Sequence, residues 1–229
     1  MAAGLLLCQT DHMPLLTCQA VLFDLDGVLV DSTACVTRIW SAWGREHRLD
    51  PGYVVHVAHG QRTVETVRTV APHLDAEQEA ALIEQREIED TDGLRVLPGA
   101  LALLSALPFS RYAIVTSGTR RLATKRLQVA GLPVPPRMIT ADDVSRGKPD
   151  PEPYLKGAEL LGFAASECLV FEDAPSGIRS AQAAGAKAIG IPTTYRPEEL
   201  AAANLVIPSL RAVEVRTGDM NGRLLLEIG

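Results

Sequence analysis

Short apolar runs, each followed by small or acidic residues, recur along this chain and constrain its fold more than any other feature. They occupy residues 20–25, 111–118, 167–177, 186–193 and 204–209. Such runs are typical of parallel strands that are buried on both faces. Segments with helical composition separate them, and two of these end at Gly131 and Gly185, a common helix stop. Strands that alternate with helices predict an α/β fold with a parallel sheet.

The stretch from residue 34 to residue 98 differs because it has helical composition and contains no strand-like run. One helical face within it gathers four large apolar residues, namely Val36, Ile39, Trp40 and Trp43. This spacing makes the tryptophans candidates for a local core rather than for ligand stacking. The sequence therefore predicts three parts, which are an N-terminal tail at 1–19, a core of residues 20–33 and 99–229, and an inserted helical cap at 34–98.

Composition excludes several classes of protein. A length of 229 residues suits one large domain or a core with a small insertion. The net charge of -6 and the pI near 5.4 argue against a nucleic-acid partner. No apolar run reaches the roughly 18 residues of a membrane span. The four cysteines form no C-x-x-C pair, which favours reduced thiols in a cytoplasmic protein over a zinc or redox site.

Near the C-terminus, alternating residues flank Asn221-Gly222. An Asn-Gly pair between alternating runs is typical of the tight turn of a β-hairpin. We therefore expect the last strands of the chain to pair with each other in antiparallel fashion.

The first apolar run ends at two neighbouring carboxylates, Asp24 and Asp26, which precede Gly27. Such carboxylates repel each other unless a cation lies between them or one of them keeps its proton. Mg²⁺ prefers oxygen ligands of this kind. A D-x-D-G sequence alone also fits an ordinary polar turn. An EF-hand loop fails as an alternative, because Leu29 and Cys35 stand where that loop needs glycine and glutamate.

Two further polar clusters follow later strands, and they are Thr116, Ser117 and Gly118, then the acidic pair Glu172 and Asp173. Between them lies Lys148, one of only four lysines, in a loop that Gly147 and Pro149 hold rigid. Alone, each has an ordinary explanation as a helix cap or as a solvated lysine in a Pro-rich loop. The carboxyl ends of parallel strands meet at one edge of a sheet, where ligands bind. We therefore expect one site, in which acids hold Mg²⁺, Lys148 and Ser117 neutralise a phosphoryl group, and Asp24 attacks phosphorus.

Four motifs in this order, DLDGVLVDS, TSG, GKPDPEPY and FEDAPSGI, resemble those of the haloacid dehalogenase superfamily. The layout is similar to the β-phosphoglucomutase-like branch. Within it, HGQRTVETV and GKPDPEPYLKGAELLG look most like sugar- and polyol-phosphate phosphatases, such as those of 2-deoxyglucose 6-phosphate and hexitol phosphates. The resemblance implies a Rossmann-like three-layer core with a small inserted helical cap, and a monomer.

The resemblance also implies residue roles. Asp24 is the expected nucleophile and Asp26 the general acid and base. Mg²⁺ is expected on the Asp24 carboxylate, the Asp26 backbone carbonyl and Asp173, with Glu172 acting through a water. The phosphoryl group is expected to contact a set of four residues, which are Thr116, Ser117, Gly118 and Lys148. The expected activity is a Mg²⁺-dependent phosphatase that forms an aspartyl phosphate on small sugar or polyol phosphates.

Departures from the relatives sort the alternatives. Dehalogenases of the superfamily lack the second aspartate, whereas Asp26 is present here. Phosphonate hydrolases need a cap lysine, and residues 34–98 contain none. Val36 stands where β-phosphoglucomutase has a histidine, and the cap lysine of that enzyme is missing too. A sugar phosphomutase stays as the alternative enzyme, and a binding or regulatory protein as the non-enzymatic alternative.

Specificity is expected from the cap. Four polar residues surround the flexible Gly60, namely His59, Gln61, Arg62 and Glu65. We expect all four to face the active site and to hydrogen-bond sugar hydroxyls. A solvated helix start is the alternative explanation for this segment.

Overall fold

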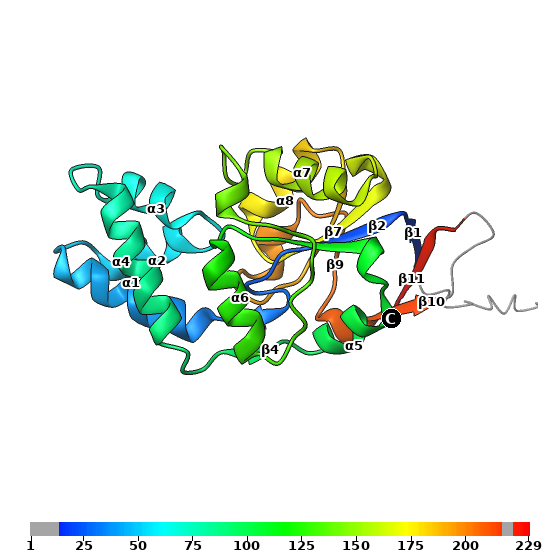
Figure 1. Cartoon of the computed structure of the whole chain (residues 1–229), viewed down its shortest axis with the longest axis horizontal. Helices are drawn as coiled ribbons and strands as arrows, with labels where there is room; N and C mark the ends of the chain where they lie inside the picture. The colour runs from blue at the N-terminus through cyan, green and yellow to red at the C-terminus, as the bar shows by residue number, and fades with distance from the viewer. Residues whose placement is uncertain (1–13, 217–221) are drawn as a thin grey trace, which may run out of the picture.

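The computed structural model describes residues 14–216 and 222–229 (Figure 1). Its centre is a six-stranded sheet with the order β6-β5-β2-β7-β8-β9, in which all neighbouring strands are parallel. The strands are β2 (Ala20–Phe23), β5 (Tyr112–Val115), β6 (Met138–Ile139), β7 (Cys168–Glu172), β8 (Lys187–Gly190) and β9 (Leu205–Val206). The predicted α/β fold is confirmed. Within this sheet, β6 is the one strand that was not predicted, because Met138 and Ile139 lie between Arg137 and Thr140 and form no longer apolar run.

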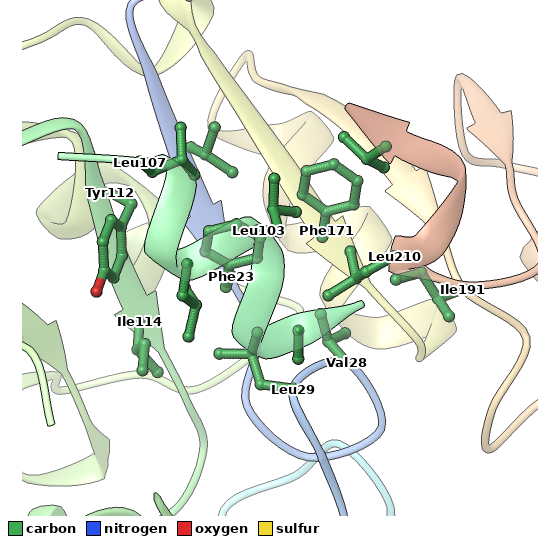
Figure 2. Packing of buried hydrophobic residues seen from close by; sticks show 14 of the residues in the cluster. Phe23, Val28, Leu29, Leu103, Leu107, Tyr112, Ile114, Phe171, Ile191 and Leu210 are labelled. Carbon is green, nitrogen blue, oxygen red and sulfur yellow. The ribbon is translucent and has the colours of Figure 1, made fainter. Parts of the chain in front are cut away.

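Helices cover both faces of this sheet. Successive side chains of each strand point to opposite sides, and because the strands are largely apolar, both faces must be buried. The helices are α5 (Ala100–Ala106) and α6 (Arg120–Val129) on one face and α7 (Glu152–Leu161) and α8 (Pro175–Ala183) on the other. Phe23 of β2 stacks on Phe171 of β7 with ring centroids 5.4 Å apart, and Leu103 of α5 belongs to the same cluster (Figure 2). Leu22, which precedes Phe23 in β2, points to the opposite face of the sheet and packs in the cluster of Tyr154 of α7. The core therefore has three layers.

A group of four helices stands apart from the sheet at the left of Figure 1. They are α1 (Thr33–Glu46), α2 (Pro51–Ala58), α3 (Thr63–Val70) and α4 (Ala76–Glu89). They enclose their own apolar cluster, to which Trp40 and Trp43 belong, as the helical pattern predicts. A short antiparallel pair, β3 (Val30–Asp31) and β4 (Arg95–Val96), joins the two chain crossings between cap and core. In the described part of the chain, no helix is long and apolar enough to cross a membrane.

A second, antiparallel sheet has the order β1-β11-β10 and lies at the end of the core that is remote from the cap (Figure 1). Its strands are β1 (Leu15–Cys18), β10 (Val213–Arg216) and β11 (Leu224–Ile228). The prediction of a tail at 1–19 was wrong for residues 15–18, because β1 pairs with β11 and buries Cys18. Antiparallel pairing of β10 with β11 agrees with the predicted hairpin, although Asn221 lies outside the described residues.

Short 3₁₀ turns complete the described chain at Phe109–Arg111, Ala141–Asp143, Ala165–Glu167, Pro197–Leu200 and Leu210–Ala212.

Candidate active site

Three of the predicted site residues lie at the carboxyl ends of neighbouring strands, at one edge of the sheet. Asp24 follows the last residue of β2, Thr116 follows β5, and Glu172 ends β7. Because β2 lies between β5 and β7, these positions are neighbours. The structure thus brings together residues that are far apart in the sequence.

Three buried carboxylates form an acidic cluster at this edge. Oxygen atoms of Asp24, Glu172 and Asp173 all lie within 4.8 Å of one another. Two glycines make this approach possible. A Cβ at Gly27, where φ is +82°, would lie 1.9 Å from Oδ2 of Asp173, and one at Gly177 would lie 1.6 Å from Oε1 of Glu172.

Lys148 extends its ammonium group into this cluster. Its Nζ donates to Oδ1 of Asp24 at 2.5 Å, to Oε1 of Glu172 at 2.7 Å and to the carbonyl of Val115 at 3.1 Å. Burial, the largest influence on its pKa, lowers it, yet the two carboxylates together raise the Lys148 pKa well above its usual value. The lysine therefore stays charged beside Asp24.

The cluster fits a divalent cation. Three carboxylates against one ammonium leave an excess of two negative charges when all are ionised. Burial raises the pKa of Asp24 to about 7, and the negative charges of Glu172 and Asp26 contribute, while Lys148 opposes the shift. Burial and the negative charges of Glu172 and Asp24 raise the pKa of Asp173 well above its usual range. A doubly charged ion would balance the excess, and an all-oxygen donor set suits Mg²⁺.

Glu172 is already engaged by protein groups. Its Oε1 accepts from Lys148 and from the Tyr154 hydroxyl at 3.0 Å, and its Oε2 accepts from the backbone N–H of Ala174 at 2.9 Å. Both oxygens of Glu172 thus already accept hydrogen bonds from the protein, which disfavours this residue as a direct metal ligand.

The Asp26 carboxylate has different partners and is not a member of the acidic cluster. The Ser32 hydroxyl donates to its Oδ1 at 2.7 Å, and Nη1 of Arg126 donates to its Oδ2 at 2.6 Å. Arg126 was not predicted. It lies on α6 four residues after the buried Leu122 and three after the buried Ala123, and an arginine on an apolar helix face is the signal that would have found it.

The hydroxyl cluster after β5 lines the same pocket as Asp24 and Asp26. Thr116 Oγ1 accepts from the N–H of Gly118 at 3.1 Å and so shapes the turn. The Ser117 hydroxyl donates to the carbonyl of Gly60 at 3.1 Å, which ties this core turn to the cap. His59 and Gln61 of the cap also line the pocket, as predicted.

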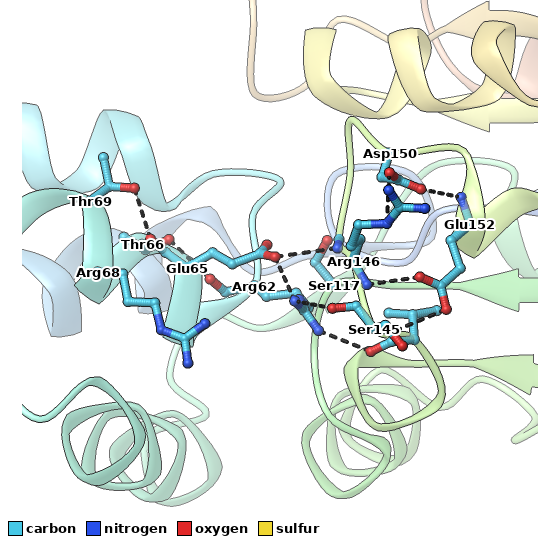
Figure 3. A network of polar contacts seen from close by, with 12 residues as sticks. Arg62, Glu65, Thr66, Arg68, Thr69, Ser117, Ser145, Arg146, Asp150 and Glu152 are labelled. Carbon is cyan, nitrogen blue, oxygen red and sulfur yellow. Dashed lines mark hydrogen bonds and ion pairs between the residues drawn. The ribbon is translucent and has the colours of Figure 1, made fainter.

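Arg62 and Glu65 do not line that pocket, so they do not face the active site in the way that we expected from the sequence. The Arg62 guanidinium donates to the carbonyls of Val144 and Ser145, both at 3.0 Å, and to Oε1 of Glu65 at 2.5 Å. The same Glu65 oxygen accepts from the N–H of Gly147 at 3.3 Å. Figure 3 shows Arg62 and Glu65 of the cap beside the core loop that carries Ser145 and Arg146. Arg62 and Glu65 thus connect the cap to the core.

Arg62→Ala should lower kcat/KM about tenfold for every good substrate, because hydrogen bonds from a charged group to two core carbonyls are lost and the cap docks less well. Steady-state kinetics on two substrates checks this. Arg68→Ala on the same helix is the matched control, since Arg68 and its partner Glu77 are both exposed and such pairs contribute little. Equal effects of the two substitutions, or a loss confined to one substrate, would contradict the docking role.

Comparison with known proteins agrees with this geometry. The protein family described as haloacid dehalogenase-like hydrolase matches residues 18–185 of this chain. Hexitol phosphatase A of Escherichia coli (strain K12) is 42% identical over 92% of this chain and 99% of that protein. Glycerol-1-phosphate phosphohydrolase 1 of Saccharomyces cerevisiae is 37% identical over 88% and 86%, respectively. The 2-deoxyglucose-6-phosphate phosphatase 2 of the same yeast is 33% identical over 92% and 95%.

Solved structures share the fold. A hydrolase from Pseudomonas syringae has a TM-score of 0.76 at 28% identity and covers 84% of this chain and 94% of its own. The β-phosphoglucomutase of Clostridium difficile has a TM-score of 0.75 at 21% identity, with 84% and 92% covered. The chain belongs to the haloacid dehalogenase-like hydrolases. Its reaction class is that of the phosphoric monoester hydrolases, the class of its named relatives.

Proposed function

We propose that this enzyme is a Mg²⁺-dependent phosphatase of small sugar or polyol phosphates that works through an aspartyl phosphate. The observation that supports this most directly is the Asp24 carboxylate, which a charged Lys148 holds at 2.5 Å inside a cluster suited to a divalent cation. The names of two relatives, a hexitol phosphatase and a glycerol-1-phosphate phosphohydrolase, support a polyol phosphate as substrate.

The reaction has two steps. In the first, a carboxylate oxygen of Asp24 attacks phosphorus, the bond from phosphorus to the leaving oxygen breaks, and Asp26 gives that oxygen its proton. In the second, Asp26 accepts a proton from a water molecule that attacks the aspartyl phosphate, which releases phosphate and restores Asp24. Asp24 and Asp173 would hold Mg²⁺, which when bound neutralises charge on the phosphoryl oxygens.

Other groups orient the participants. Lys148 carries its positive charge beside Asp24 and stabilises the negative charge of the phosphoryl group during transfer. Ser32 and Arg126 hold the Asp26 carboxylate between them, so that its position is defined before substrate arrives. The proton transfer itself requires this carboxylate to turn toward the leaving oxygen.

The setting that we infer is a monomeric cytoplasmic enzyme without a nucleic-acid partner. The described cysteines, Cys18, Cys35 and Cys168, are buried free thiols, which suits a reducing compartment. The net charge of -6 gives no support to binding of nucleic acid.

The experiment that tests this proposal is phosphate release from hexitol, glycerol, hexose and pentose phosphates, each with Mg²⁺ and with EDTA. We expect Mg²⁺-dependent release, with polyol phosphates among the best substrates. Conversion of β-glucose 1-phosphate to the 6-phosphate without release would replace the proposal by a phosphomutase. Folded protein without either activity would favour a binding protein.

A further inference from the structure

The pocket that contains Asp24 also contains a buried carboxylate from the cap, Glu87 of α4. Glu87 is only 3% exposed. Burying a carboxylate is costly unless charged or polar partners compensate it. A role in this pocket would explain why an acidic side chain stands at such a position.

Glu87 has a hydrogen bond with the side chain of Trp40, and the one positive charge beside it, that of Arg126, is shared. Nη2 of Arg126 lies 3.3 Å from Oε1 of Glu87, while Nη1 of the same guanidinium is bonded to Asp26. One positive charge therefore serves two carboxylates. Among the described residues that line the pocket, Arg126 is the only lysine or arginine, against a set of four acids, Asp24, Asp26, Glu87 and Asp173. A second anionic group on a substrate would meet no free cation of the protein here.

His59 adds a neutral acceptor to the cap side of the pocket. Its Nδ1 lies 2.8 Å from the carbonyl of Val55, and because a carbonyl only accepts, Nδ1 carries the proton. Nε2 is therefore an acceptor, and within the described part of the chain this buried atom has no hydrogen-bond partner. Burial lowers the pKa of His59, which keeps the ring neutral. An O–H group of a substrate would satisfy Nε2.

We propose that Glu87 and His59 select a neutral, polyhydroxylated leaving group and reject substrates that carry a second anionic group besides the reacting phosphate. Hydroxyl groups donate to the Glu87 carboxylate and to Nε2 of His59. A carboxylate or a second phosphate in the same place brings no hydrogen to donate and is repelled by Glu87. The inference rests on the proposed phosphatase function and narrows its substrates to monophosphates of neutral polyols and sugars.

A matched pair of substrates tests this selection, namely glucitol 6-phosphate and 6-phosphogluconate, which have the same carbon chain but differ at C1 as CH₂OH and carboxylate. We expect kcat/KM of the wild type to favour glucitol 6-phosphate about 100-fold. Glu87→Gln keeps the size of the side chain and removes its charge, so the ratio should fall about tenfold. Glu89→Gln, at an exposed position of the same helix, should leave it unchanged.

The ratio is the deciding measurement, because a general loss from displacement of Arg126 or Asp26 would lower both rates alike and cancel. A wild-type enzyme that hydrolyses both compounds equally well overturns the selection and leaves the phosphatase proposal standing, and this test does not depend on whether the variant folds. An active Glu87→Gln enzyme with an unchanged ratio also overturns it. Absence of release from every phosphate would instead overturn the proposed function.

Discussion

Asp24→Asn should abolish phosphate release, with kcat lower by about 10⁴-fold or more. The amide is a very poor nucleophile toward phosphorus, so no aspartyl phosphate forms at this position. The change removes one buried negative charge and keeps the size of the side chain, and Lys148 retains its bond to Glu172 at 2.7 Å. The folded structure should therefore persist. Phosphate release at saturating substrate, together with circular dichroism of the variant, measures both expectations.

Asp31→Asn is the matched control for this substitution. Asp31 belongs to the same sequence motif, but its carboxylate bonds the largely exposed side chain of Arg95 at the base of the cap. We expect activity within about threefold of the wild type, since an ion pair with one exposed partner contributes little. If Asp24→Asn retained more than about 1% of activity while Asp31→Asn lost most of it, the nucleophile would be assigned wrongly.

The sheet and the catalytic edge follow from local sequence, for a physical reason. Parallel strands buried on both faces are continuous apolar runs, and polar residues directly after them must gather at one edge. Asp24, Thr116 and Glu172 were predicted together on this basis. Lys148 needed a further signal, its placement in a rigid loop as one of four lysines.

Contacts between cap and core could not be predicted in the same way. Arg62 and Glu65 stand at a helix start near the pocket, and only the tertiary docking of the cap directs them to Val144 and Gly147 instead. Glu87 reads as one more acid in a charged helix until Arg126 is placed opposite it. Sequence periodicity gives the face of a helix, but it does not give the partner against which that face packs.

Mg²⁺ should stabilise the folded enzyme, and this stabilisation should grow as pH rises from 5 to 8. In the metal-free chain the pKa of Asp24 is about 7, against an ordinary value of 3.8, so the folded state binds more protons than the unfolded state between these values. The contribution of Asp24 to the stability of the metal-free fold is therefore fully present at low pH, and it is lost as pH rises from 3.8 to about 7. Mg²⁺ binds the ionised carboxylate, so its effect increases over the same interval.

At pH 8 and a Mg²⁺ concentration of about 100 times Kd, linkage gives about 2.7 kcal/mol. For a chain of this size that corresponds to a rise in Tm of roughly 5–10 °C, which differential scanning calorimetry with Mg²⁺ and with EDTA would measure. Asp173→Asn should lose most of this shift, because Asp173 is one of the two direct ligands that we propose, whereas Asp31→Asn should keep it. A shift of the same size at pH 5 and pH 8, or one that survives in Asp173→Asn, would place the ion elsewhere on the protein.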